Sequence, residues 1–209
     1  IRAVTAALDG SSAVVEVSTA LTGTADSVTY ELADAEGQVL ATAEGLGTVQ
    51  LAANGITPWT PETPALYTLR VTVTANGTAD TTEQRIGIRT IQVSSKTGLL
   101  LNGQPRTMKG GCIHHDLGIL GAADHAAAER RRIRLMKESG FDAIRAAHNP
   151  FGPAFLDACD ELGMLVVEEA FDEWVMGRTS FGLHVTFEQC WEKDLEDMIT
   201  RDSNHPCIV

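Results

Sequence analysis

Polar side chains that could bind a hydroxyl-rich ligand stand at three places in the second half of the chain. Each group comes directly after an apolar run that predicts a β-strand. The groups are His114-His115-Asp116, then Arg145 with His148 and Asn149, then Glu168-Glu169 with Asp172 and Glu173. In a β/α barrel the carboxyl ends of the strands form the active-site face, so these side chains are expected to converge. Imidazole, guanidinium, amide and carboxylate groups together suit a polar ligand.

The carboxylates of the third group do not form a catalytic pair in this interpretation. Glu168 and Glu169 are adjacent and point to opposite sides of the sheet, so at most one faces the expected site. The other is expected to pair with an Arg or Lys on a helix. Carboxylates on one strand and its loop do not flank a bond from two sides, so they are interpreted as groups that line a pocket. Asn204-His205-Pro206 is typical of a turn rather than of a site.

Alternating strands and helices must position these residues. Strands are expected at 105–114, 142–148 and 164–169, with a fourth beginning at 207–209, and helices at 124–139, 153–162 and 186–203. Asp124 is the expected N-cap of the first helix, Gly163 ends the second, and Thr186 with Gln189 forms a capping box for the third. This alternation predicts parallel strands with right-handed crossovers. Three such units and the start of a fourth are less than half of a (β/α)8 TIM barrel, which takes ~250 residues.

The expected helices carry apolar stripes that predict their buried faces. The second helix has Phe155, Leu156, Cys159 and Leu162, and the third has Trp191, Leu195, Met198 and Ile199.

The barrel is expected to be incomplete, with strands 1–3 and the start of strand 4. An incomplete barrel leaves strands one and four as edges and uncovers an inner face lined by residues such as Ile144 and Val166 or Val167. Self-association of the chain through the half-barrel, by strand pairing or by apposed inner faces, is therefore expected.

The first half, residues 1–93, has the pattern of an immunoglobulin-like β-sandwich. Short segments alternate with period two at 13–17, 28–32, 38–41 and 66–73, and about seven strands fit this length. Asn76-Gly77 predicts a type I′ hairpin turn into a strand near 83–93. The three prolines of 58–64 exclude a helix there. Residues 94–209 form the second domain, the N-terminal part of the barrel.

Composition restricts the partners of the 209-residue chain. A net charge of −12 argues against nucleic acid and against an anionic membrane surface, and no run of 18 apolar residues could span a bilayer. The four cysteines, Cys112, Cys159, Cys190 and Cys207, have no regular spacing and are interpreted as buried free thiols, which favours a reducing compartment such as the cytoplasm. Localisation stays open, because both ends look truncated. A metal site at Cys112, His114 and His115 would need further ligands, so neither a metal nor another cofactor is expected.

Six motifs together resemble family 2 glycoside hydrolases, the β-galactosidase and β-glucuronidase group. Pro58–Tyr67 and Gly87–Val93 are similar to the sandwich and to the strand that leads into the barrel. Leu101–Pro105 followed by Lys109–Gly118 resembles the first barrel strand, and Met136–Pro150 resembles the second. Glu168–Trp174 and Arg201–Pro206 continue the match, which covers nearly the whole chain in order.

The resemblance implies a role for each matching residue. His114, Arg145 and His148 would lie in the sugar-binding pocket, with Asn149 beside them, and Asp172 and Glu173 would line it. Glu173 matches a position that helps to bind Mg²⁺ in some β-galactosidases, but the His two residues later is here Val175. The family's acid/base and nucleophile glutamates, at the ends of strands four and seven, are expected beyond Val209. The resemblance thus implies a central fragment of a retaining exo-β-glycosidase that is inactive alone.

Two other functions stay open beside this one. The chain could be a non-catalytic carbohydrate-binding or structural module, which would hold sugar without the rest of a barrel. A metal-dependent hydrolase ranks last, because such enzymes usually use His-x-His, whereas His114 and His115 are adjacent and diverge. Galactosides, glucuronides and mannosides all remain compatible with the sequence, as do several oligomeric states.

Overall fold

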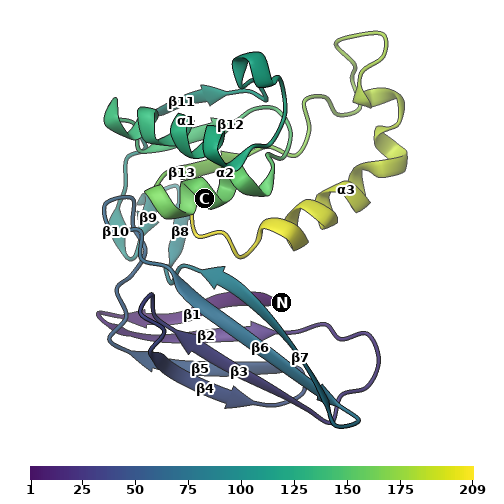
Figure 1. Cartoon of the computed structure of the whole chain (residues 1–209). Helices are drawn as coiled ribbons and strands as arrows, with labels where there is room; N and C mark the ends of the chain where they lie inside the picture. The colour runs from purple at the N-terminus through teal and green to yellow at the C-terminus, as the bar shows by residue number, and fades with distance from the viewer. The chain divides into compact units, whose positions relative to one another are not determined.

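The computed structural model describes all 209 residues and contains two compact units (Figure 1). The first unit comprises Ile1–Thr107 together with Asn204–Pro206, and the second comprises Met108–Ser203 together with Cys207–Val209. The expected domain boundary between residues 93 and 94 falls within a strand of the first unit. The division at that position stays a prediction.

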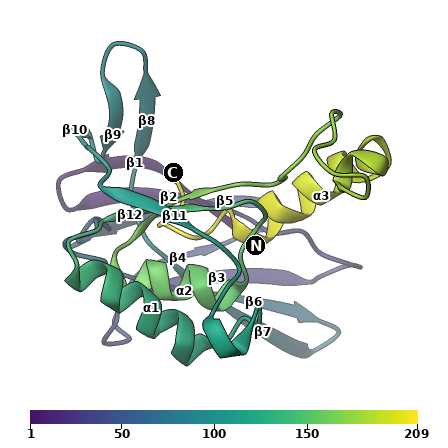
Figure 2. The same ribbon diagram turned by 90° about the horizontal axis from the view of Figure 1, so that it is seen from above.

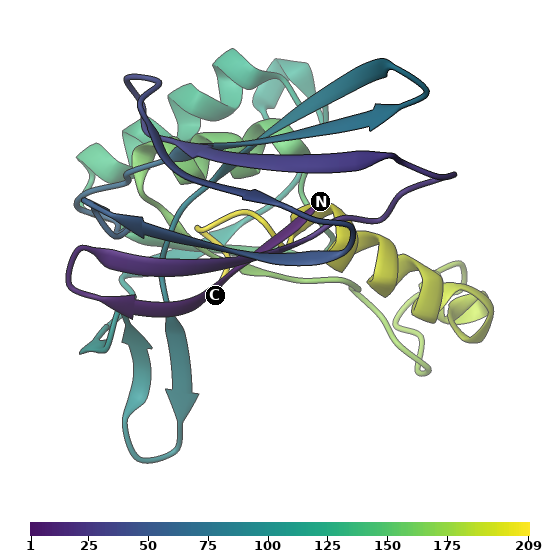
Figure 3. The same ribbon diagram turned by 90° about the horizontal axis from the view of Figure 1, so that it is seen from below.

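Two antiparallel sheets form the sandwich of the first unit. One has the order β1-β2-β5, with β1 at Arg2–Asp9, β2 at Ser12–Ser18 and β5 at Thr48–Asn54. The other has the order β4-β3-β6-β7, with β4 at Val39–Glu44, β3 at Ser27–Ala33, β6 at Tyr67–Ala75 and β7 at Thr78–Ile86. Figure 3 shows these strands from below. The seven strands confirm the expected immunoglobulin-like sandwich.

The core of the sandwich follows from the alternation in the sequence. Every second residue of β2 is buried, at Ala13, Val15 and Val17, while Glu16 faces solvent. The opposite sheet supplies Val28, Tyr30, Leu32, Leu69 and Val71 to the same core. Side chains of period two from both sheets therefore interdigitate between the layers.

The predicted Asn-Gly hairpin is present between β6 and β7. Asn76 and Gly77 have φ angles of 49° and 75°, as a type I′ turn requires, and Ala75 pairs with Thr78. The following strand was placed too late by the sequence: β7 begins directly after the turn and ends at Ile86, not near residues 83–93. A two-residue turn leaves no room for a longer loop before pairing resumes.

A small third sheet was not expected from the sequence. It has the order β10-β9-β8, with β8 at Ile91–Ser94, β9 at Gly98–Leu101 and β10 at Gln104–Pro105. Asn102 and Gly103, with φ angles of 51° and 73°, turn the chain between β9 and β10. The strand predicted at 105–114 is therefore two strands, β10 and the later β11. The Asn102 side chain accepts a hydrogen bond from the Thr90 N–H (2.9 Å) and donates one to the carbonyl of buried Trp59 (3.1 Å).

Asn204–Pro206 belongs to the first unit although it lies near the end of the chain. The Asn204 Oδ1 atom accepts from the Ala3 N–H, and its Nδ2 donates to the Ile1 carbonyl, both at 2.9 Å. The Arg89 Nε donates to the Pro206 carbonyl (2.7 Å). A Cβ atom on Gly87 would come within 2.6 Å of Pro206, so the close approach requires glycine there. The segment is a turn, as expected.

A parallel sheet in the order β11-β12-β13 forms the second unit, with β11 at Gly110–Ile113, β12 at Ala143–Ala146 and β13 at Leu165–Glu168. Helices α1 (Ala126–Glu138) and α2 (Pro153–Leu162) lie on one face of this sheet, as Figure 2 shows from above. Short 3-10 turns lie at Gly118–Leu120 and Leu183–Val185, and helix α3 is Phe187–Asp202. Ile208 bridges Val166 in parallel, which confirms the start of a fourth strand. The sheet is not closed into a barrel.

Some helix ends differ from the expectations. Gly163 ends α2 in the left-handed conformation, as predicted (φ 71°). Asp124 does not cap its own helix, because His125 is the N-cap of α1 and no side chain caps it. The Asp124 Oδ2 instead accepts from the Ala154 N–H in the first turn of α2 (3.1 Å). Thr186 makes no side-chain cap bond, so the predicted capping box is wrong.

Helix α3 exposes much of its predicted apolar stripe. Trp191 and Ile199 are 41% and 52% exposed, and the buried residues of the helix are Phe187 and Asp202. None of the helices has the length and apolar character needed to cross a bilayer.

We expect Gly110→Ala to destabilise the second unit, because a Cβ atom there would overlap the Ala143 carbonyl group of the neighbouring strand. Overpacking of this kind costs ~1–3 kcal/mol. Gly111→Ala is the matched control, since its Cβ would meet no atom within 4 Å. Urea unfolding of both variants measures the difference. Equal free energies of unfolding would contradict the close strand approach.

Candidate active-site face

The two faces of the parallel sheet carry different residues. Cys112, Arg145 and Val167 are partners in register across the three strands, so they share one face. Ile144 and Val166 alternate with them and are fully buried, on the face that α1 and α2 cover. The expectation that Ile144 lines the open face is therefore wrong. Of the two alternatives Val166 and Val167, it is Val167, 37% exposed, that lies there. The open face is more polar than expected.

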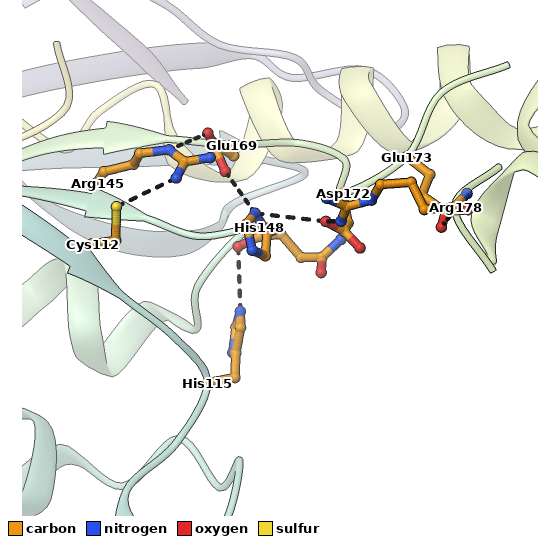
Figure 4. A network of polar contacts seen from close by, with 9 residues as sticks. Cys112, His115, Arg145, His148, Glu169, Asp172, Glu173 and Arg178 are labelled. Atoms are coloured by element: carbon orange, nitrogen blue, oxygen red, sulfur yellow. Dashed lines mark hydrogen bonds and ion pairs between the residues drawn. The ribbon is translucent and has the colours of Figure 1, made fainter. Parts of the chain in front are cut away.

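Arg145 is held in place on this face by two partners (Figure 4). Its Nε donates to Glu169 Oε1 (2.6 Å), and its NH1 donates to the Cys112 Sγ (3.3 Å). These contacts with Cys112 and Glu169 raise the pKa of the Arg145 guanidinium. Glu169 thus takes the inward position of the adjacent pair. Glu168 is turned to the other side, with Arg201 of α3 at 3.9 Å, as the alternation predicted.

His148 lies between two carboxylates. Its Nδ1 is 3.4 Å from Glu169 Oε2 and 3.6 Å from Asp172 Oδ1, and Asp172 also forms an ion pair with Arg178. The His114 ring meets the His148 ring edge to face at 5.0 Å. Four predicted site residues, His114, Arg145, His148 and Asp172, are thus linked to one another by direct contacts or through Glu169. We call Cys112, His114, Arg145, His148, Glu169 and Asp172 the polar row.

The segment that carries His114 is fixed from α1. Arg132 donates to the carbonyls of His114 (3.1 Å) and Asp116 (3.3 Å) and pairs with buried Glu129 at 2.6 Å. Burial raises the pKa of the Glu129 carboxyl, and the Arg132 guanidinium opposes this effect. Removing Arg132 would leave this buried carboxyl without its cation.

His115 points elsewhere than His114. Its ring stacks on Phe151 at 4.0 Å, and its Nε2 is 3.3 Å from the Asn149 carbonyl oxygen. Cys112, His114 and His115 thus have three different partners, which argues against a metal site formed by them. Asn149 itself lines a cavity of about 330 Å³ with Phe171, Leu183, Met198 and other residues.

Glu173 is turned into its own loop. The residue is 5% exposed, and its carboxylate accepts from the Arg178 N–H and contacts His184 Nδ1, both at 2.9 Å. The hydrogen bond from His184, with that from the Arg178 backbone, lowers the pKa of Glu173. Mg²⁺ requires near-octahedral oxygen ligands at ~2.0–2.1 Å. Glu173 with Val175 at the second position does not offer that arrangement.

Three residues of this region, Cys112, Arg178 and His184, are not among the predicted site residues. Glu169 is predicted only as one of two adjacent glutamates of which at most one faces the site. Strand alternation puts it on the same face as Arg145 and so identifies it as the inward one. The expectation that all four cysteines are buried is wrong for Cys112, which is exposed on the open face of the sheet, and Cys190 is only partly buried. The same alternation places Cys112 beside Arg145, a partner that its interpretation as a thiol or a metal ligand does not include. Arg178 and His184 lie in a loop with no periodic pattern, so no sequence signal marks them.

Cys112 is expected to be the fast-reacting thiol of the native chain, because it is exposed while Cys159 and Cys207 are buried. Burial also raises the pKa of Cys159 well above its usual value, and burial with Asp194 raises the pKa of Cys190. The thiolate is the reactive form, so these thiols should react slowly or not at all. Titration with dithionitrobenzoate should show one fast phase that Cys112→Ser removes. A fast phase that persists in this variant would contradict the assignment.

Comparison with known proteins places these residues in a family. Residues 3–89 match the glycosyl hydrolases family 2 domain, and residues 91–209 match the family 2 TIM barrel domain. The β-galactosidase BoGH2A of Bacteroides ovatus is 37% identical, over 98% of this chain and 26% of that protein. A putative β-glucuronidase of Formosa agariphila is 33% identical, over 98% of this chain and 20% of that protein.

Solved structures agree with the sequence matches. A family 2 member from Bacteroides cellulosilyticus superposes with a TM-score of 0.91 at 34% identity, covering 100% of this chain and 29% of that one. A β-glucuronidase from Ruminococcus gnavus, in complex with C6-substituted uronic isofagomine, gives 0.86 at 29% identity, covering 97% and 34%. The chain spans 26% or less of the length of the two curated relatives named above. From its sandwich, its parallel βα units and these matches, the chain belongs to glycosyl hydrolase family 2.

Proposed function

We propose that the chain supplies one wall of the sugar-binding pocket in a retaining exo-β-glycosidase. The observation that carries this proposal is the polar row at the carboxyl ends of three parallel strands. In a barrel this edge is the active-site face, and convergent charged and polar groups suit a hydroxyl-rich ligand. The relatives that support a β-linked sugar as substrate are named as β-galactosidases and β-glucuronidases.

Each residue of the row has a distinct role in this proposal. Glu169 and Cys112 orient Arg145, whose remaining N–H groups donate to the sugar. Glu169 and Asp172 hold His148 through Nδ1, which leaves Nε2 directed to the ligand, since the partner of one ring nitrogen sets the state of the other. His114 supports the His148 ring, and Asn149 lies next to it in the chain. Glu173 acts indirectly, because it accepts a hydrogen bond from the backbone of Arg178, whose side chain pairs with Asp172.

The carboxylates of the row bind rather than catalyse in this proposal. Retaining hydrolysis uses two carboxyl groups ~5–5.5 Å apart on opposite sides of the scissile bond. Glu169 and Asp172 approach the same nitrogen of His148, and each already pairs with a guanidinium group, of Arg145 and Arg178. Both therefore lie on one side of any bound sugar. The catalytic acid/base and nucleophile come from outside this chain, which we expect to be inactive alone.

The proposed domains differ in their sequence pattern, with alternating strands in the first and strand–helix units in the second. Residues 1–93 form the immunoglobulin-like domain, and residues 94–209 form the N-terminal part of the barrel domain. The two family matches, 3–89 and 91–209, lie close to this division.

Arg145→Ala and His148→Ala are expected to lower kcat/KM by roughly 10- to 100-fold in a protein that carries this chain within a complete barrel. A hydrogen bond to a charged group contributes about 1.5–3 kcal/mol, and about 1.4 kcal/mol is tenfold in rate. Release of nitrophenol from aryl β-galactoside, β-glucuronide and β-mannoside measures the effect and identifies the sugar class.

The matched controls are Arg134→Ala and His125→Ala, which change the same residue types at exposed positions of α1 and its N-cap. The controls should retain the activity of the unmodified enzyme. Unchanged kinetics in Arg145→Ala and His148→Ala would remove both residues from the sugar site. Nitrophenol release by the 209-residue chain itself would show that the catalytic carboxyls lie within it. Tight sugar binding by the chain alone would favour the non-catalytic binding module instead.

We also propose that the chain self-associates. Seven of the large apolar side chains that the second unit exposes lie after β13 or on α3. They are Trp174, Val175, Met176, Phe181, Val185, Trp191 and Ile199, with exposures of 41% to 98%. Six others lie elsewhere in the unit, at Met108, Ile119, Leu120, Leu135, Phe141 and Val167. Large exposed apolar patches seldom persist in soluble monomers.

Light scattering after size exclusion is expected to show a species larger than one 22.3 kDa chain at micromolar concentration. Replacing Trp174 and Phe181, which are 66% and 98% exposed, by Ser should shift the chain toward monomer, because apolar burial drives such association. Val39→Ser, in the sandwich and 45% exposed, is the control that should leave the mass unchanged. A strictly monomeric unmodified chain would show the proposal to be wrong.

A further inference from the structure

The loop from Glu173 to Val185, between β13 and α3, is organised around a buried carboxylate. The Glu173 side chain is 4% exposed, whereas its loop neighbours Trp174, Val175 and Met176 are 65% exposed or more. One carboxylate oxygen accepts from the Arg178 backbone N–H and the other contacts His184 Nδ1, both at 2.9 Å. The two contacts join the beginning of the loop to its middle and to its end.

Two glycines allow the loop to close this tightly. A Cβ atom on Gly182 would overlap the Glu173 carboxylate, and a Cβ atom on Gly177 would overlap the His184 ring. The backbone therefore lies directly against both members of the pair. Larger residues at either position would separate Glu173 from His184.

A chain of contacts leads from this pair to the polar row. Glu173 fixes the backbone of Arg178, the side chain of Arg178 pairs with Asp172, and Asp172 lies 3.6 Å from His148 Nδ1. The first step is a hydrogen bond from a backbone N–H, the second is an ion pair, and the third is a contact of 3.6 Å between a carboxylate oxygen and an imidazole nitrogen. Figure 4 shows Asp172, Glu173 and Arg178 beside His148.

We infer that His184 is a positioning residue: its hydrogen bond to Glu173 closes the loop and thereby sets Asp172 against His148. In this arrangement hydrogen-bond donors occupy the Glu173 carboxylate, which is held by neither a divalent cation nor a sugar hydroxyl. A distance of 2.9 Å between Oε2 and Nδ1 is a direct hydrogen bond and leaves no space for an ion between them.

The inference extends the proposed function to a loop outside the polar row. Its test uses neither sugar nor turnover, so the two proposals can fail separately. The test uses the full 209-residue chain, with trypsin cleavage after Arg178 as the measure of loop opening. The Arg178 side chain is 62% exposed, so cleavage is limited by the loop backbone.

His184→Ala should increase the rate of cleavage after Arg178 by roughly tenfold or more, because a hydrogen bond to a charged group is lost. His184→Asn should restore protection, since the Asn Nδ2 can donate from nearly the same position as the imidazole Nδ1. His125→Ala, at an exposed position, is the matched control and should cleave like the unmodified chain. The imidazole NMR signals of His148 should shift in His184→Ala and return in His184→Asn.

A second experiment uses the unmodified chain alone and needs no variant. Millimolar Mg²⁺ or EDTA should change neither the cleavage rate nor the Tm. Saturable protection by Mg²⁺ would overturn the inference, because it would show that a cation holds the loop. Cleavage of folded His184→Ala at the unmodified rate, or an unshifted His148 signal, would overturn the positioning role of His184.

Discussion

The carboxylate of Glu169 is the interaction on which the candidate site depends. One oxygen binds the Arg145 guanidinium at 2.6 Å, and the other lies 3.4 Å from His148. A single anion at the end of β13 therefore orients two cationic or titratable groups that come from β12 and the loop after it. Because Glu169 comes from one βα unit and Arg145 and His148 come from another, their arrangement forms only when β12 and β13 are paired in register. The register of β12 against β13 therefore also fixes the geometry of the site.

Support for that carboxylate comes from the rest of the second unit. Arg132 on α1 fixes the carbonyls around His114, and Arg178 engages Asp172 from the loop. The apolar residues Ile144 and Val166 anchor the opposite face of the same strands against α1 and α2. Burial on one face and ion pairing on the other are thus separated by the period of two along each strand.

Local pattern in the sequence was enough to predict the sandwich, the order of the βα units and most of the polar row. Period-two alternation marked β2, β3 and β6, and the Asn76-Gly77 turn could be assigned because its backbone needs two positive φ angles. The failures have a common cause, which is that the partner of a side chain lies far away in the sequence. Asp124 looks like a cap for the helix that follows it, yet it caps α2, thirty residues later. The loop pair Glu173–His184 has no periodicity, so only the folded chain brings it together. The apolar stripe of α3 predicts a buried face, but whether that face is buried depends on neighbouring elements that the spacing of its residues does not encode.

The hydrogen bonds of Asn204 to β1 have a consequence for the synthesis of this protein. They join Asn204 to Ala3, which lies 201 positions earlier in the chain, and to Ile1, which lies 203 positions earlier. On the ribosome the sandwich strands emerge first, and nearly the whole second unit must follow before Asn204 can reach them. Until then the Ile1 carbonyl and the Ala3 amide must bond water or another partner in place of Asn204. The last step in completing the first unit is therefore delayed by the time needed to translate about two hundred codons, which at roughly 5–20 residues per second is on the order of ten seconds or more.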